Sequence, residues 1–349
     1  LIVGAGLLVP AQFGFGSDSK DEKLKEKNAK YIFNFSSPYK TENFVATPHA
    51  HLEIKKLIEQ YTNNKVYVKI HDGGVDGKGT RLAGKVKLNK IQGALVSVSN
   101  LSPMIPEIDI LNIPFWSSSP EEYTRLFNSS SWKNHILSKT KKHKTQVLFP
   151  YVVGARTATS TKKYGKRIVK PEDFEGVKFR IPGSKSLAVF YKLTKAIPQK
   201  FPWATAGKTA RLGRYQAIDP SIAGLYAGPM DLKGTLGVIS EVETVHDGWV
   251  AIGSTDFIES LDANTRIQFL DAMEEIQKKQ RGLYQSAKDF CVSEFNKNGT
   301  KIYTPTQNEK NILADAFGHT NPAWDPVKKK LLGKNGMKIF DELYKAAKI

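Results

Sequence analysis

Hydrophobic and polar positions alternate along the first third of the chain with two different periods. Short apolar or alternating runs predict strands at residues 31–35, 65–71 and 93–100. Between the first two runs, the segment HAHLEIKKLIEQYTNN has the spacing of an amphipathic helix. The apolar face of that predicted helix consists of Ala50, Ile54, Leu57, Ile58 and Tyr61.

The same alternation continues to the C-terminus. Residues 145–160 predict a long apolar strand that runs into polar residues, and VKFRI (177–181) predicts another buried strand. The segment SLAVFYKLTKA follows as a helix, and residues 261–298 predict a long helix that bends near Gly282. Strands separated by helices of this size predict an α/β fold with mainly parallel sheets.

The N-terminal residues differ from the rest of the chain. Residues 1–16, LIVGAGLLVPAQFGFG, contain an apolar run that is too short for a comfortable membrane span and is followed by small residues. This pattern is typical of the end of a secretory signal segment, although a core strand or an N-terminal anchor would also fit. Residues 17–30 are highly charged and are predicted to be a linker.

The charge of the chain raises the question of a nucleic-acid partner. The 349 residues include 52 Lys and Arg against 34 Asp and Glu, a formal net charge of +18. The lysines are spread along the chain, however, and their short clusters lack interleaved aromatic residues. We therefore expect no nucleic-acid partner, and a basic surface that attracts anionic ligands fits the same composition.

Motifs for catalysis, cofactors or metals are weak. The glycine-rich loop DGGVDGKGT (72–80) follows a predicted strand but lacks the spacing of a phosphate-binding loop. The lone cysteine, Cys291, excludes an internal disulfide and lies in a helix-like pattern typical of the core. The histidines form no metal-binding or catalytic motif. We expect no enzyme activity, no cofactor and no metal.

Two arginines at strand ends are the remaining candidates for chemistry. Arg156 follows the long apolar run, and Arg180 lies inside VKFRI. Ligands of α/β sheets bind near the carboxyl ends of strands, and a guanidinium matches a carboxylate in bidentate geometry. The two arginines could converge on one anion, while structural salt bridges are the simpler explanation from spacing alone.

The order of several motifs resembles a known family. These motifs are LSPMIPEIDILNIPFW (101–116), ARTATSTK, KPEDFEGVKFRIPGS, KFPW and QAIDPS. Together they resemble the DctP-type extracytoplasmic solute receptors of TRAP transporters, collinearly from about residue 31 to the end. The resemblance implies two α/β domains of the periplasmic-binding-protein type, with a ligand cleft between them, crossing strands and a long bent helix. We assign residues 31–153 and about 245–284 to domain I, and residues 154–244 and about 285–349 to domain II.

The resemblance also implies the function and the binding residues. A periplasmic monomer would capture a small organic acid and deliver it to the membrane permease subunits of the transporter. The ligand carboxylate would bind Arg180, with Arg156 as a second arginine and Trp203 packed on the ligand. Asp219 falls on the polar residue of the family's turn, and Ser36 and Ser37 fall on its ligand-facing segment.

Two departures from the family pattern bear on the ligand. This chain has Trp203, Ala204 and Thr205 where the family commonly has Phe-Ser-Glu, and Asp219 where it commonly has Asn. An acid facing the pocket would repel a second ligand carboxylate, which disfavours a simple C4-dicarboxylate, or it could instead bind an ammonium, a hydroxyl or Arg156. The ligand class therefore stays open among carboxylates and sulfonates. A sensory receptor on the same fold is the alternative function, followed by an enzyme on that fold.

Overall fold

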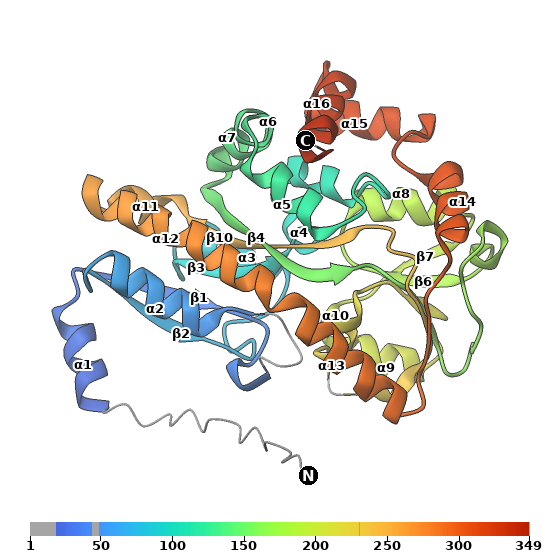
Figure 1. Ribbon diagram of the computed structural model, residues 1–349, viewed down its shortest axis with the longest axis horizontal. Coiled ribbons are helices and arrows are strands. Elements are labelled where there is room, and N and C mark those ends of the chain that lie inside the picture. The colour runs from blue at the N-terminus through green and yellow to red at the C-terminus, as the bar shows by residue number, and fades with distance from the viewer. Residues whose placement is uncertain (1–18, 44–48, 230, 349) are drawn as a thin grey trace, which may run out of the picture.

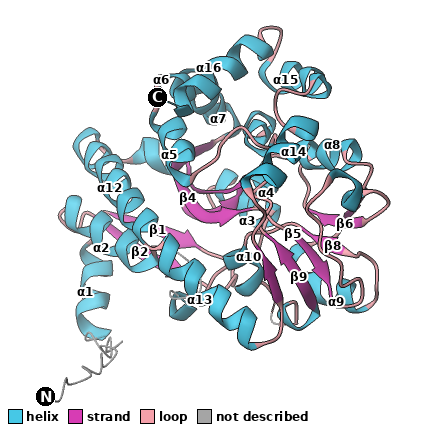
Figure 2. Ribbon diagram, turned by 45° about the vertical axis from the view of Figure 1, so that its right-hand side comes forward, coloured by secondary structure: helices cyan, strands magenta, loops and turns pink. Residues whose placement is uncertain are grey.

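A computed structural model describes residues 19–43, 49–229 and 231–348 of the chain. Two β-sheets lie side by side, each with helices packed around it (Figures 1 and 2). The first sheet has the strand order β2-β1-β3-β10-β4. Its strands are β1 (Tyr31–Ser36), β2 (Val66–His71), β3 (Gly93–Ser97), β4 (Thr145–Ala155) and β10 (His246–Ser254).

The second sheet has the strand order β11-β9-β5-β8-β6-β7. Its strands are β5 (Ala158–Thr161), β6 (Lys178–Ile181), β7 (Ile197–Lys200), β8 (Ala217–Ile218), β9 (Leu236–Ser240) and β11 (Lys301–Tyr303). The α/β fold class predicted from the alternation of strands and helices is confirmed. The expectation of mainly parallel sheets needs correction, because both sheets are mixed.

The antiparallel pairs involve the strands that pass between the sheets. β1 pairs in parallel with β2 and β3, and β6 pairs in parallel with β7 and β8. β10 is antiparallel to both β3 and β4, and β5 is antiparallel to both β8 and β9. The sequence pattern did not predict these pairs. A buried strand is a continuous apolar run whether its neighbours are parallel or antiparallel to it.

Two connections between the sheets run next to each other. The chain passes from β4 to β5 through Arg156 and Thr157, and it returns from β9 to β10 through residues 241–245. The backbone N–H of Arg156 donates to the carbonyl of Val245 at 2.6 Å, so the two crossings are hydrogen-bonded to each other. The prediction of a single strand at 145–160 is therefore wrong, because this segment forms two strands, one in each sheet.

A long helix makes the third connection and bends as predicted. Helix α12 (Ala263–Gly282) packs on α2 (His51–Tyr61) and on β4, whereas α13 (Tyr284–Lys297) packs on α10 (Ile222–Tyr226) and β11. The buried Gln280 side chain fastens α12 to the crossing strand β4. Its Oε1 accepts from the Val152 N–H at 2.9 Å, and its Nε2 donates to the Val152 carbonyl at 3.0 Å.

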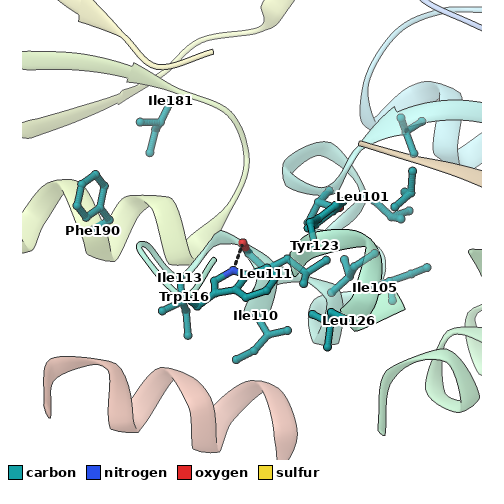
Figure 3. Packing of buried hydrophobic residues seen from close by; sticks show 14 of the residues in the cluster. Leu101, Ile105, Ile110, Leu111, Ile113, Trp116, Tyr123, Leu126, Ile181 and Phe190 are labelled. Carbon is teal, nitrogen blue, oxygen red and sulfur yellow. Dashed lines mark hydrogen bonds between the residues drawn. The ribbon is translucent and has the colours of Figure 1, made fainter. Parts of the chain in front are cut away.

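The remaining helices surround these sheets. They are α1 (Ser19–Asn28), α3 (Thr80–Lys87), α4 (Val98–Leu101), α5 (Pro120–Asn128), α6 (Ser130–Trp132), α7 (Ser138–Thr140), α8 (Lys185–Leu193), α9 (Ala206–Arg211), α11 (Thr255–Ser260), α14 (Gln307–Phe317), α15 (Asp325–Leu332) and α16 (Gly336–Lys348). The short 3-10 segment η2 (Pro106–Asn112) precedes a buried turn in which Trp116 Nε1 donates to the Leu111 carbonyl at 3.1 Å (Figure 3). None of the described helices has the length and apolar character needed to cross a bilayer.

The ends of the chain bear on the predicted organisation. The signal-like residues 1–16 lie outside the described residues, and the predicted linker contains helix α1. Helix α16 packs on α5 and α6, and α15 packs on η2, all of which lie within the span predicted for domain I. The assignment of residues 285–349 to domain II, like the other domain boundaries, stays a prediction.

Candidate functional site

A cleft lies where elements of the two sheets face each other. It contains about 560 Å³ of space between protein atoms, including space open to solvent. Its lining residues come from both sides of the crossing strands. They are Pro38, Tyr39, Lys78, Gly79, Leu95, Val96, Ser97, Asn100, Arg156, Arg180, Pro182, Trp203, Pro220, Gly224 and Trp249. Aromatic and aliphatic groups predominate, with a few polar groups among them, which is typical of small-molecule sites.

Arg180 lies in the wall of this cleft, near the end of β6. Its side chain is 4% exposed. Both Nε and Nη2 donate to the carbonyl oxygen of Phe201, at 3.0 and 2.8 Å. Among the described residues, no carboxylate forms an ion pair with this guanidinium within 4.0 Å. A buried cation is thus held by a neutral acceptor, although buried charges usually have a charged partner.

The surroundings of Arg180 combine burial with aromatic contact. Burial lowers the pKa of Arg180 to about 10, against the opposing effect of the Asp219 carboxylate and with a smaller contribution from Arg156. The Arg180 Cζ lies 5.3 Å from the centroid of the Trp203 ring, which is within the range of cation–π contacts. The guanidinium is charged at neutral pH, and one of its faces is shielded by an indole.

Arg156 lies in the crossing between β4 and β5 and has a charged partner. Its Nη1 lies 3.2 Å from Oδ1 of Asp219, and its Nη2 donates to the Ser99 hydroxyl at 2.7 Å. Arg156 is 4% exposed and Asp219 is fully buried. Burial raises the pKa of Tyr191 well above its ordinary value, and the Asp219 carboxylate nearby raises it further. Because Arg156 is paired with the Asp219 carboxylate, much of its positive charge is balanced inside the protein.

The six residues singled out in the sequence take different places around the cleft. Arg180, Arg156 and Trp203 all line it, whereas Asp219 lies behind the wall. Ser36 and Ser37 are buried beside it: the Ser36 hydroxyl donates to Asp76, and the Ser37 hydroxyl accepts from the Tyr39 N–H. The next two residues, Pro38 and Tyr39, are the ones that line the cleft.

Several lining residues were not singled out in the sequence. Trp249 of β10 packs against Tyr39, with ring centroids 5.2 Å apart. Asn100 of α4 donates through its Nδ2 to the Ser97 hydroxyl at 2.9 Å. Lys78 and Gly79 come from the loop DGGVDGKGT. The glycines of that loop indicated that another group lies close to its backbone, but the sequence did not identify that group.

A buried carboxylate positions the segment after Arg180. Asp109 of η2 accepts from the backbone N–H groups of Lys185 and Ser186 at 3.0 and 2.9 Å. It also accepts from the Ser184 hydroxyl at 2.7 Å. A carboxylate at a helix N-terminus satisfies free backbone donors and interacts favourably with the helix dipole. Asp109 thereby fixes the start of α8, which only residues 182–184 separate from the end of β6.

Comparison with known protein families supplies a match for the region that carries this cleft. Residues 39–206 match the family described as bacterial extracellular solute-binding protein, family 7, DctP. The matched region contains Arg156, Arg180 and Trp203, together with most of the cleft lining.

Solved structures match almost the whole chain. A TRAP periplasmic solute-binding protein from Desulfovibrio salexigens with bound orotic acid has a TM-score of 0.80 and 16% identity, covering 91% of this chain and 99% of that one. A TRAP periplasmic solute-binding protein from Sulfurospirillum deleyianum with bound succinate has a TM-score of 0.76 and 20% identity, covering 90% and 99%. A sugar acid binding protein from Advenella mimigardefordensis in complex with galactonate has a TM-score of 0.77 and 16% identity, covering 91% and 97%. At these identities the likeness establishes the fold, with its two domains and long bent helix.

Proposed function

We propose that this chain, whose residues 39–206 match the DctP family of bacterial extracellular solute-binding proteins, belongs to that family and captures a small organic acid in the cleft for a TRAP-type transporter. The ligand carboxylate binds Arg180, and the loaded protein delivers it to the membrane permease. The protein acts in the periplasm, as a monomer, and carries out no catalysis.

The observation that carries this proposal is the environment of Arg180. Its guanidinium is almost completely buried in the cleft wall, yet its hydrogen bonds go to the Phe201 carbonyl rather than to an acid. A bound carboxylate would supply the missing negative charge through short charge-assisted hydrogen bonds. Exclusion of water from the cleft would strengthen that interaction, because electrostatic attraction increases as the local dielectric constant falls.

The family and the fold support a carboxylic acid as the ligand. The similar structures described above hold succinate, orotic acid and galactonate, each of which carries a carboxylate. In this chain Arg156 is already paired with Asp219, so Arg180 is the arginine available to the ligand. Trp203, Trp249 and Tyr39 provide apolar surface for the body of the molecule.

Binding is tested by calorimetry and thermal shift on the purified protein, after native mass spectrometry has shown whether a ligand remains from expression. The panel contains dicarboxylates, hydroxy and keto acids, aromatic acids, sulfonates and amino acids. An acid at one hundred times its Kd should stabilise the protein by about 2.7 kcal/mol. A shift confined to one class of acid identifies the ligand chemistry.

The role of Arg180 is tested with three variants. Arg180→Ala should cost at least about 2 kcal/mol of binding, as truncation of a buried charged partner does. Arg180→Lys should restore only part of it, because lysine keeps the charge but loses the planar fork. Arg281→Ala, at an exposed position, should bind like the wild type. Unchanged affinity in Arg180→Ala, with the free protein still folded, would overturn the proposal.

A further inference from the structure

Half of the net positive charge of the chain lies in two segments that contribute nothing to the cleft lining. Residues 130–144 contain five lysines and no acid, and residues 325–348 contain seven lysines and three acids. Twelve lysines less three acids give a net charge of +9, against +18 for the whole chain, in about a ninth of its length. Like charges held close together repel each other and destabilise a compact fold, so this concentration indicates a partner that neutralises it.

The two segments are packed against each other. The first comprises α6, the π-helical segment η3 (Lys133–Leu137), α7 and the 3-10 segment η4 (Lys141–His143), and the second comprises α15 and α16. Helix α16 contacts α6 and α15, and all of these helices lie at the same end of the molecule (Figures 1 and 2). His135 Nε2 of the first segment lies 2.8 Å from Glu342 Oε2 of the second. The charges of the two segments therefore share one region of the surface.

The turn between α15 and α16 brings lysines of both helices close together. The Gly336 N–H donates to the Gly333 carbonyl at 2.8 Å, and a Cβ on Gly336 would overlap the carbonyl of Lys328. The two helices thus approach each other backbone to backbone. Lys328 itself is buried, and its amine donates to the His319 carbonyl at 2.6 Å. The lysines that follow it, at positions 329, 330 and 334, are exposed.

Six lysines of the two segments have no acidic partner. Asp341 pairs with Lys345 at 2.8 Å, and Glu342 pairs with His135, so these acids are already bound. Among the residues that the structure describes, no ion pair within 4.0 Å involves the six lysines. We call them the lysine face: Lys133, Lys139, Lys141, Lys329, Lys330 and Lys334. All of them except Lys139 are exposed.

The composition of the lysine face fits a bilayer surface better than a protein partner. Protein interfaces are enriched in arginine and aromatic residues and depleted in lysine. Neither segment contains an arginine, and no large hydrophobic side chain among their described residues is exposed. A lysine carries a compact charge on a flexible stem, which can follow mobile headgroups, whereas the rigid fork of arginine suits a fixed acceptor. Each lysine near an acidic bilayer increases the affinity about fivefold.

We infer that the lysine face binds the acidic phospholipid headgroups of a bilayer and holds the protein at the membrane surface. This interaction goes beyond the proposed capture of an organic acid and does not depend on it, because no residue of the lysine face lines the cleft. Binding at the surface would confine the loaded protein to the plane of its permease. The effective concentration of one for the other would rise without any new contact between them.

The interaction is tested with the full chain and lipid vesicles. Vesicles of phosphatidylglycerol and phosphatidylcholine in equal parts are compared with vesicles of phosphatidylcholine alone in a flotation assay. The protein should float with the acidic vesicles at low ionic strength and should dissociate as NaCl is added, because salt screens exposed charges. Lysine acetylation followed by mass spectrometry should show protection of Lys329, Lys330 and Lys334 by the acidic vesicles, and no protection of Lys56.

Two triple variants of equal net charge separate the lysine face from the general charge of the protein. Lys329→Gln/Lys330→Gln/Lys334→Gln should weaken vesicle binding about 100-fold. The control, Lys56→Gln/Lys90→Gln/Lys208→Gln, removes three exposed lysines that form no ion pair within the described residues and lie on other elements. It should lose no more than about threefold, because charges distant from the bilayer are screened. Both variants should keep the Tm and the organic-acid affinity of the wild type.

Three results would overturn the inference. The first is a wild type that does not float with acidic vesicles at low ionic strength, and the second is an equal loss in the two triple variants. The third is binding of poly-L-glutamate that is tighter than vesicle binding at an equal concentration of anionic groups, which would assign the lysine face to an acidic protein. None of these results affects the proposed function, which depends on Arg180.

Discussion

Arg156 in the cleft wall forms a buried ion pair with Asp219 behind it, with 3.2 Å between the guanidinium Nη1 and the carboxylate Oδ1. The two residues come from the crossing after β4 and from the end of β8, so the pair joins one connection between the sheets to the second sheet. It also distinguishes the two arginines of the cleft. Arg156 has its counter-charge inside the protein, whereas Arg180 is adjacent to a carbonyl and a tryptophan.

Asp219→Asn should lower the free energy of unfolding by about 3–5 kcal/mol, because Arg156 would remain as an unbalanced buried cation. A bound organic acid would supply part of the lost negative charge. The ligand should therefore raise the Tm of Asp219→Asn more than it raises the Tm of the wild type. Urea denaturation and thermal shift, each with and without ligand, measure both effects.

The exposed pair between Arg211 and Asp231 provides the control. Its atoms are 2.7 Å apart, but both side chains are more than one-third exposed. Asp231→Asn should cost no more than about 1 kcal/mol and should leave the ligand response unchanged. Similar losses in the two variants would contradict the role assigned to the buried pair.

Asp109→Asn should destabilise the protein by about 2 kcal/mol, because a charged acceptor of two backbone N–H groups is replaced by a neutral amide. Ligand affinity should fall as well, since only residues 182–184 separate the start of α8 from β6, the strand that carries Arg180. Asp289→Asn, at an exposed position on α13, is the matched control and should be neutral. Lost stability with full ligand affinity would show that Asp109 does not position the site.

Gly154→Ala should be destabilising by about 1–3 kcal/mol, because Gly154 has a φ of +121° that favours glycine. A Cβ there would also lie 3.2 Å from Ser221 Cβ and from a ring carbon of Tyr284. Gly84→Ala is the opposite case: Gly84 lies in helix α3, and a Cβ at this position would meet nothing within 4 Å. It should be stabilising by up to about 1 kcal/mol. Denaturation curves of both variants test this difference in sign.

Stability should fall as the pH drops below about 6.5, and His51 should contribute to that fall. Burial lowers the pKa of His51 well below its ordinary value of 6.5, and His49, stacked on it at 4.1 Å, lowers it further. The unfolded chain therefore takes up a proton on acidification that the folded chain does not, which favours unfolding. His51→Phe should show a shallower loss of unfolding free energy between pH 7.5 and 5.5. An equal slope in the variant and the wild type would contradict this role.

Local sequence patterns predicted much of the fold. The alternation of strands and helices, the strand at VKFRI and the bend near Gly282 were all legible in the sequence, because each depends on residues close together in the chain. The division of residues 145–160 into β4 and β5 could not be predicted from the sequence. Both strands are buried, so the run shows no change of period where the chain passes from one sheet to the other.

The site was less accessible from the sequence than the fold. The position of Arg156 and Arg180 at strand ends suggested a cleft, but the partner of Arg156 lies 63 residues further on and is not part of any local motif. The place of Lys78 in the cleft lining depends on the path of a glycine-rich loop that contacts Asn100 of another element. Such contacts between distant segments follow from the tertiary arrangement and produce no periodic pattern in the sequence.

The place of β10 in the first sheet also constrains how the chain can fold. β10 lies between β3 and β4, yet residues 156–245 separate it from β4 in the sequence. Before β10 has formed, β3 and β4 each have an edge with unpaired backbone N–H and C=O groups. Such edges can pair with strands of other chains. Pairings between such distant segments also slow folding. A fragment ending before β10 should therefore aggregate rather than form a half-molecule, and the two sheets are expected to reach their native state in one cooperative step.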